Sequence, residues 1–206
     1  MWHNKRGEIM KTLIIVDVQN DFLEGGALAV PGGNEIIEGI NKLDYDLVIA
    51  TQDFHPEGHG SFASTNKADV FSLGKLNGLD QVMWPDHCVE GSHGVGFSKD
   101  LKINIDRVVK KGRNKNVDSY SGFLDNDGKT FTELNQYLKE RNITEIDVVG
   151  LALDYCVKFT CLDGVKLGFK VNLLKDLTRA VNMNEGDDLN TIKELKEAGV
   201  TILELK

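Results

Sequence analysis

Short runs of aliphatic and β-branched residues alternate along this chain with stretches in which apolar residues recur at helical spacing. The apolar runs predict six strands, at residues 12–16, 47–51, 107–110, 147–151, 170–174 and 200–203. The helical stretches are marked by Ile36, Ile37, Ile40 and Leu43, by Phe131, Leu134 and Leu138, and by Leu189, Ile192 and Leu195. Strands that alternate with helices are typical of a parallel sheet with helices on its faces. We therefore predict an α/β fold, a doubly wound three-layer sandwich with a six-stranded, mostly parallel sheet.

Helix ends and one irregular stretch complete this pattern. Thr130 and Glu133 have the spacing of a capping box, which predicts a helix start there. Gly199 follows Ala198 where a helix commonly ends in a left-handed residue. Residues 53–102 hold many Gly, Ser, His and Asn residues with little periodicity. Loops of this length are unusual in compact domains unless they carry function, so we expect part of the site here.

Length and composition narrow the class of protein. The 206 residues suit one domain spanning 1–206, and 41% apolar with 27% charged residues is ordinary for a soluble globular chain. A net charge of −8 argues against nucleic acid or an anionic membrane as a partner and favours a small neutral ligand. No export signal or membrane span is visible. Three cysteines without such a signal predict reduced thiols and a cytoplasmic protein.

Chemically active side chains follow four of the predicted strands. Asp17 follows the first strand, Asp53 and His55 the second, Lys111 the third and Cys156 the fourth. Ligands of open α/β sheets bind outside the carboxyl ends of the strands. We therefore expect these five residues to converge on one site.

Cys156 opens a predicted helix in which Val157 and Cys161 lie on the buried face. A helix N-terminus and a nearby lysine both favour the thiolate, the form that attacks a carbonyl carbon. Asp17 is a candidate general base for this thiol, with Lys111 as its partner. The alternative for Cys156 is a buried structural cysteine, the class to which we assign Cys161 and Cys88. The alternative for Asp17 and Lys111 is a salt bridge at the strand ends.

Asp53 and His55 are one residue apart, so in extended backbone their side chains point to the same side. A carboxylate and imidazoles are ligand types of an open catalytic metal site. His87 and His59 are the candidates for completing it. The alternative is a hydrogen-bond network within the loop, the role to which we assign His93.

Five segments together resemble a known family. These are DVQNDF at 17–22, TQDFHPEGHGSFAS at 51–64, WPDHC at 84–88, DSYSGF at 118–123 and GLALDYCVKFT at 150–160. In this order they resemble the nicotinamidase/pyrazinamidase enzymes of the isochorismatase-like cysteine hydrolase superfamily. The likeness begins near Lys11, which leaves residues 1–10 as an N-terminal extension.

The resemblance implies an amidohydrolase that converts nicotinamide, and with it pyrazinamide, to nicotinate and ammonia through a cysteine thioester. The implied residues are the triad Asp17, Lys111 and Cys156, the metal ligands Asp53, His55 and His87, oxyanion-hole N–H groups of Ala152 and Cys156, and ring contacts from Phe22, Trp84 and Tyr120. The resemblance leaves the role of His59 open, either as a metal ligand or as a residue that supports the ligands from behind. The implied cofactor is one divalent ion that binds the substrate ring, with zinc as first choice and iron or manganese as alternatives. A non-proline cis peptide is implied between Leu151 and Ala152, and a homo-oligomer is left open.

Two other functions compete with this interpretation. A related amidohydrolase acting on a carbamoyl or ureido substrate would not need the metal-ligating set. A non-catalytic protein of the same fold would have lost a member of the triad, and this chain retains all three.

Overall fold

The six predicted strands form one sheet in the computed structural model, which describes residues 10–205. Their order across the sheet is β5-β2-β1-β6-β7-β8, and every neighbouring pair is parallel. The strands are β1 (Thr12–Val16), β2 (Leu47–Asp53), β5 (Arg107–Lys111), β6 (Glu145–Leu151), β7 (Lys170–Arg179) and β8 (Thr201–Leu203). The predicted six-stranded sheet is therefore confirmed, and its strands are parallel throughout.

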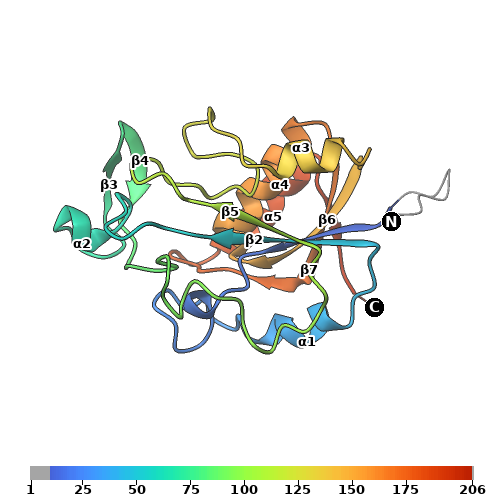
Figure 1. Cartoon of the computed structure of the whole chain (residues 1–206), viewed down its shortest axis with the longest axis horizontal. Coiled ribbons are helices and arrows are strands. Elements are labelled where there is room, and N and C mark those ends of the chain that lie inside the picture. Colours follow the sequence, from blue (N-terminus) through green and yellow to red (C-terminus); the bar gives the residue numbers. More distant parts are fainter. Residues whose placement is uncertain (1–9, 206) are drawn as a thin grey trace.

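Helices cover both faces of this sheet, as the three-layer prediction requires (Figure 1). One face carries α1 (Glu35–Asn41), and the other carries α3 (Leu134–Lys139), α4 (Lys158–Lys166) and α5 (Asp187–Glu197). The central strand β1 shows why its sequence is apolar from Leu13 to Val16. Leu13 and Ile15 join the core that includes α1, whereas Ile14 and Val16 join the core on the opposite face. A strand buried on both faces has no position for a polar side chain until it leaves the sheet.

Strand β7 is longer than the sequence pattern predicts. The predicted strand ended at residue 174, whereas β7 continues to Arg179. The pairing of β6 with β7 shifts register after Val148, and the exposed Lys175 and Asp176 lie at that irregularity. These two polar residues end the apolar pattern, although the strand itself goes on.

The predicted start of α3 is wrong by several residues. Thr130 lies in the loop before the helix, which begins at Leu134 with Glu133 as its N-cap residue. The hydroxyl of Thr132 accepts the N–H of Leu134 at 3.1 Å, so this threonine supplies the local hydrogen bond instead. Phe131, predicted on the buried face, is outside the helix and exposed.

The other helix predictions have mixed outcomes. The predicted end at Gly199 is confirmed, because this glycine has φ +97° directly after Ala198, the C-cap residue of α5. Within α5, Leu195 is buried as expected, but Leu189 is exposed.

Residues 53–102 contain more regular structure than predicted. They form the short helix α2 (Ala63–Asn66) and an antiparallel hairpin of β3 (Leu73–Leu76) and β4 (Leu79–Val82). Asn77 and Gly78 connect the hairpin with φ of +50° and +82°, the conformation of a tight hairpin turn. Figure 1 shows this hairpin beyond the carboxyl end of β2. The hairpin therefore belongs to the end of the sheet where the candidate residues were expected.

The predicted N-terminal extension lies outside the described residues, apart from Met10. Within residues 10–205, no helix combines the length and apolar character needed to cross a membrane.

Candidate active site and metal centre

Asp17 marks the point at which β1 leaves the sheet. It is fully buried and has φ +48°, a left-handed conformation that Asp tolerates better than most residues. The Thr51 hydroxyl, on the neighbouring strand β2, donates to Asp17 Oδ1 at 2.6 Å. The other oxygen, Oδ2, forms an ion pair with the Lys111 ammonium at 2.9 Å. One carboxylate oxygen is thus held by Thr51, and the other is paired with Lys111.

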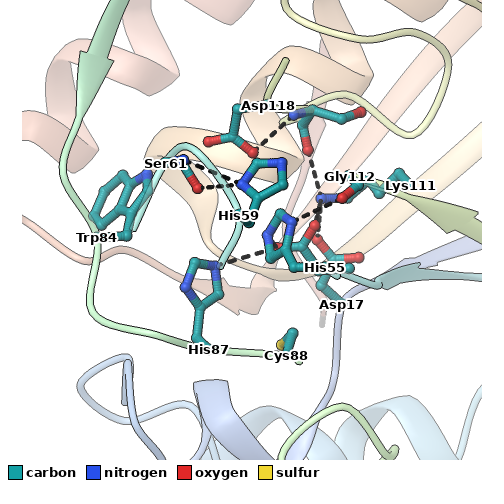
Figure 2. Close-up of polar contacts among 12 residues, drawn as sticks. Asp17, His55, His59, Ser61, Trp84, His87, Cys88, Lys111, Gly112 and Asp118 are labelled. Carbon is teal, nitrogen blue, oxygen red and sulfur yellow. Dashed lines mark hydrogen bonds and ion pairs between the residues drawn. The ribbon is translucent and has the colours of Figure 1, made fainter. Parts of the chain in front are cut away.

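Lys111 connects the predicted triad to the predicted metal set. Its buried Nζ lies 2.9 Å from Asp17 Oδ2, 3.1 Å from Asp53 Oδ1 and 3.4 Å from Cys156 Sγ. It also donates to the carbonyl of Ser119 at 2.9 Å. Figure 2 shows this lysine at the end of its strand, next to Asp17. The structure therefore brings the residues from four strand ends together, as predicted.

Cys156 lies in the turn η2 (Leu153–Val157), which has π-helical hydrogen bonding and leads directly into α4. The thiol is buried and sits just beyond the carboxyl end of β6. The expected cis peptide between Leu151 and Ala152 is present immediately before this turn.

Burial and neighbouring charges set the protonation of the thiol. Burial raises the pKa of Cys156 well above its ordinary value, and although Lys111 opposes this, the carboxylate of Asp17 adds to it. Burial and the carboxylates thus favour the neutral thiol. Of the two influences that we expected to favour the thiolate, Lys111 acts in that direction, but burial and the carboxylates oppose it.

The charges around the thiol support one another. Burial disfavours the charged form of Lys111, but Asp17 and Asp53 outweigh it and raise its pKa well above the usual range. Burial also disfavours the charged form of Asp17, which raises the pKa of this carboxyl group, and Lys111 opposes this effect. Asp53 behaves differently: burial disfavours its carboxylate, yet His55 and Lys111 hold its pKa well below the ordinary value. The site thus places the charged Lys111 between two different carboxylates. The pKa of Asp53 is lowered, whereas the pKa of Asp17 is raised.

Asp53, His55 and His87 form a compact group of potential metal ligands. Their ligand atoms lie within 4.8 Å of one another, and all three side chains are buried. Asp53 Oδ2 is 3.1 Å from His55 Nε2 and 3.4 Å from His87 Nε2.

The histidine hydrogen bonds test whether this group suits a cation. His55 Nδ1 lies 2.8 Å from the carbonyl of Gly112, and His87 Nδ1 lies 2.8 Å from the carbonyl of Pro85. Carbonyls only accept hydrogen bonds, so each ring carries a proton on Nδ1. Nε2, the nitrogen that faces Asp53, is therefore the atom that would bind a metal ion once it is unprotonated. Metal-ligating histidines characteristically donate their second nitrogen in this way. The donor set fits one divalent metal ion.

Gly112 is required at this position for two reasons. Its φ of +67° favours glycine, and a Cβ there would lie 2.6 Å from the His55 ring and 2.9 Å from Asp53 Oδ1. The strand end that carries Lys111 can therefore pass directly behind the histidine.

His59 belongs to a second, overlapping group with His55 and Asp118, whose ligand atoms also lie within 4.8 Å of one another. Its ring lies beside that of His55, with centroids 4.3 Å apart (Figure 2). Both of its ring nitrogens are engaged, Nδ1 with the Ser61 hydroxyl at 2.8 Å and Nε2 with the Asn114 carbonyl at 2.9 Å. His59 therefore has no lone pair free for a metal without rotating.

A narrow cavity connects the thiol to the metal group. Cys156, Asp53 and His87 all line it. The predicted ring contacts Phe22, Trp84 and Tyr120 line it as well, together with Ala152 and the unpredicted residues Leu28, Val30, Asp118, Tyr155 and Val181. Trp84 meets Tyr155 edge to face at 4.8 Å between centroids. The cavity has a volume of about 30 Å³, so its aromatic walls would have to move apart to admit a flat ring, which would then face Asp53, His87 and the thiol.

Two of the unpredicted residues carried a usable signal. Tyr155 directly precedes Cys156, and Val181 follows the carboxyl end of β7. Ligand sites form at the carboxyl ends of parallel strands. A prediction that ended β7 at Arg179 instead of residue 174 would therefore have pointed to Val181. The Asp154 carboxylate accepts the N–H groups of Val181 and Asn182 at 2.9 and 2.8 Å, which ties this wall to the turn of Cys156.

Comparisons with known proteins give consistent results. Residues 11–206 match the sequence profile of the family described as "Isochorismatase domain". The nicotinamidase of Escherichia coli (strain K12) is 45% identical over 202 residues, covering 95% of this chain and 95% of that protein. The structure of a yeast nicotinamidase bound to the inhibitor nicotinaldehyde is 31% identical with a TM-score of 0.89, covering 95% of this chain and 100% of that one. A Pyrococcus horikoshii pyrazinamidase in complex with zinc is 33% identical with a TM-score of 0.78, covering 95% of this chain and 99% of that one.

Proposed function

The chain belongs to the nicotinamidase branch of the isochorismatase family, and from this membership we propose that it hydrolyses nicotinamide to nicotinate and ammonia. The observation that carries the proposal is that Cys156, Asp53 and His87 line one and the same cavity, together with aromatic side chains. Its lining offers aromatic walls to a planar ring, a thiol for a carboxamide at one end and ligating side chains for a ring nitrogen at the other.

Thioester formation begins with a proton transfer. Asp17 takes the thiol proton on its carboxylate, which Thr51 and Lys111 hold in place. The Cys156 sulfur then adds to the amide carbonyl, and the N–H groups of Ala152 and Cys156 stabilise the oxyanion. Lys111 holds the thiolate and the carboxylates in place through its contacts with all three groups.

The proton on Asp17 then leaves with the product. Asp17 protonates the departing nitrogen as the C–N bond breaks, which releases ammonia and leaves a nicotinoyl thioester on Cys156. Asp17, ionised again, takes a proton from water, whose oxygen attacks the thioester carbonyl. Nicotinate leaves, and the sulfur regains its proton.

Asp53, His55 and His87 would hold one divalent ion, which we propose is zinc, with iron and manganese as alternatives that accept the same ligands. When bound, such an ion supplies a Lewis-acid contact for the pyridine nitrogen. His59 is proposed to support this group from its hydrogen-bonded position rather than as a ligand. The single-domain organisation, the cytoplasmic location, a homo-oligomer and the absence of nucleic-acid or membrane partners remain predictions.

The experiment that tests the function compares four amides. Nicotinamide and pyrazinamide should be hydrolysed well, because each offers a ring nitrogen opposite the metal group while its carbonyl lies over Cys156. Benzamide has the same outline without that nitrogen, so we expect kcat/KM to fall by about 10²–10³, or about 2.7–4 kcal/mol of transition-state binding. Picolinamide, whose nitrogen is adjacent to the amide, should also be poor.

The measurement is ammonia release under one set of conditions for all four amides. Equal kcat/KM for nicotinamide and benzamide would reject recognition of the ring nitrogen. An amidohydrolase with a carbamoyl or ureido substrate would then be the better interpretation.

A further inference from the structure

Gln19 makes an unusual set of contacts with the backbone of a proposed metal ligand. Its fully buried side chain accepts the N–H of Asp53 on Oε1 at 2.8 Å and donates from Nε2 to the carbonyl of Asp53 at 2.8 Å. The same Nε2 donates to the carbonyl of Val95 at 2.9 Å. One side-chain amide therefore satisfies both polar backbone groups of Asp53.

The topology explains why Asp53 needs such a partner. Strand β1 pairs with β2 in register only as far as Ile15 and Ala50, and the chain turns away at Asp17. Strand β2 continues to Asp53 and pairs there with Lys111 on its other side. On the β1 side no strand remains, so the amide of Gln19 takes the place of the missing backbone amide.

This contact acts on the geometry of the metal group. The carboxylate of Asp53 must face both His55 Nε2 and His87 Nε2, which lie 3.1 and 3.4 Å from it. A strand end with unpaired N–H and C=O groups would be free to twist, and the carboxylate would move with it. Groups behind metal ligands commonly change affinity by about 10–100-fold when they are removed.

We propose that Gln19 is a positioning residue of the metal centre, which fixes the backbone of Asp53 so that its carboxylate meets the two histidines. The inference rests on the proposed function, because it takes Asp53, His55 and His87 as the metal ligands. Gln19 itself touches neither the thiol nor the histidine nitrogens among the contacts of the described chain. Its effect therefore passes through Asp53.

Gln19→Met tests the proposal, because methionine has a similar length but cannot pair with the Asp53 backbone. Gln52→Met is the matched control: Gln52 Nε2 donates to the same Val95 carbonyl at 2.8 Å, and its side chain makes no hydrogen bond to the Asp53 backbone. Gln19→Asn is a second variant that keeps the polar amide, in case the methionine variant does not fold. Its shorter side chain cannot span the distance to Asp53. His55→Ala serves as the ligand-loss control.

The measurement is the zinc dissociation constant of each metal-stripped protein, obtained by competition with a chromogenic chelator, together with the thermal unfolding midpoint of the stripped form. We expect zinc binding to weaken by about 10–100-fold in the Gln19 variants, to be lost in His55→Ala and to be unchanged in Gln52→Met. Wild-type zinc affinity in the Gln19 variants would overturn the inference but not the metal site. Equal weakening of zinc binding in Gln52→Met would have the same consequence. Absence of zinc binding by the wild-type protein, or full binding by His55→Ala, would overturn the metal site and the inference together.

Discussion

Replacing Cys156 by alanine should abolish nicotinamide hydrolysis while leaving the fold intact. Alanine fits the space of the buried thiol and keeps the turn before α4, but it has no atom that can form the thioester. Removal of the nucleophile from a catalytic unit costs as much as removal of the whole unit, so we expect kcat to fall by about 10⁴-fold or more. The measurement is ammonia release, with circular dichroism to confirm that the variant unfolds cooperatively.

Cys161→Ala is the matched control for this prediction. Cys161 is also fully buried and lies on α4, but burial alone raises the pKa of its thiol, with no charged partner. Its loss should cost about 1 kcal/mol of unfolding free energy, typical of a single core substitution, and leave kcat unchanged. Hydrolysis that survives in Cys156→Ala, or disappears in Cys161→Ala, would show that the nucleophile is misplaced.

Asp17→Asn should produce the second largest loss, and it should separate two properties of the thiol. Asparagine keeps the size of Asp17 and the contact with Thr51, but it cannot take the thiol proton or give it to the leaving nitrogen. We expect kcat to fall by about 10²–10⁴-fold, the usual contribution of a general acid–base. Alkylation of Cys156 by iodoacetamide should nevertheless be at least as fast as in the wild-type protein.

The sign of the alkylation effect follows from the charges. The Asp17 carboxylate raises the pKa of Cys156, so its removal leaves the ammonium of Lys111 less opposed and lowers that pKa. More thiolate is then present at neutral pH. If alkylation slows in parallel with hydrolysis, Asp17 has only a structural role; if hydrolysis is unaffected, the general base lies elsewhere.

The convergence of Asp17, Asp53, Lys111 and Cys156 could be predicted because parallel topology places the carboxyl ends of all strands on one side. Knowing only where each apolar run ends was sufficient to bring together residues up to 139 positions apart, from 17 to 156. The contacts of Lys111 with Asp17, Asp53 and Cys156 match that prediction. This part of the site depends on topology rather than on side-chain detail.

Features that depend on local turns or on burial were not predicted. The β3–β4 hairpin was missed although Asn77-Gly78 is a strong turn signal, because its strands Leu73–Leu76 and Leu79–Val82 are largely exposed and lack a buried face. Its Gln81 donates to Asp118 Oδ2 at 2.8 Å, so the missed hairpin supports the wall of the site.

Two further features follow only from the packed structure. The raised pKa of Cys156 depends on its desolvation and on two nearby carboxylates, and the spacing of residues along the chain indicates neither. The role of Gln19 is similar, because a glutamine after a strand signals no particular partner. Its backbone contacts with Asp53 appear only once β1 turns away from β2.

The central claim is that amide hydrolysis passes through a thioester on Cys156. Rapid acid quenching of the purified, metal-loaded protein during turnover of nicotinamide, followed by peptide mass spectrometry, tests it most directly. The account predicts one nicotinoyl group on the peptide that contains Cys156, which forms and decays at least as fast as turnover. A nicotinoyl group on another residue, or continued nicotinate production after Cys156 has been alkylated, would contradict it.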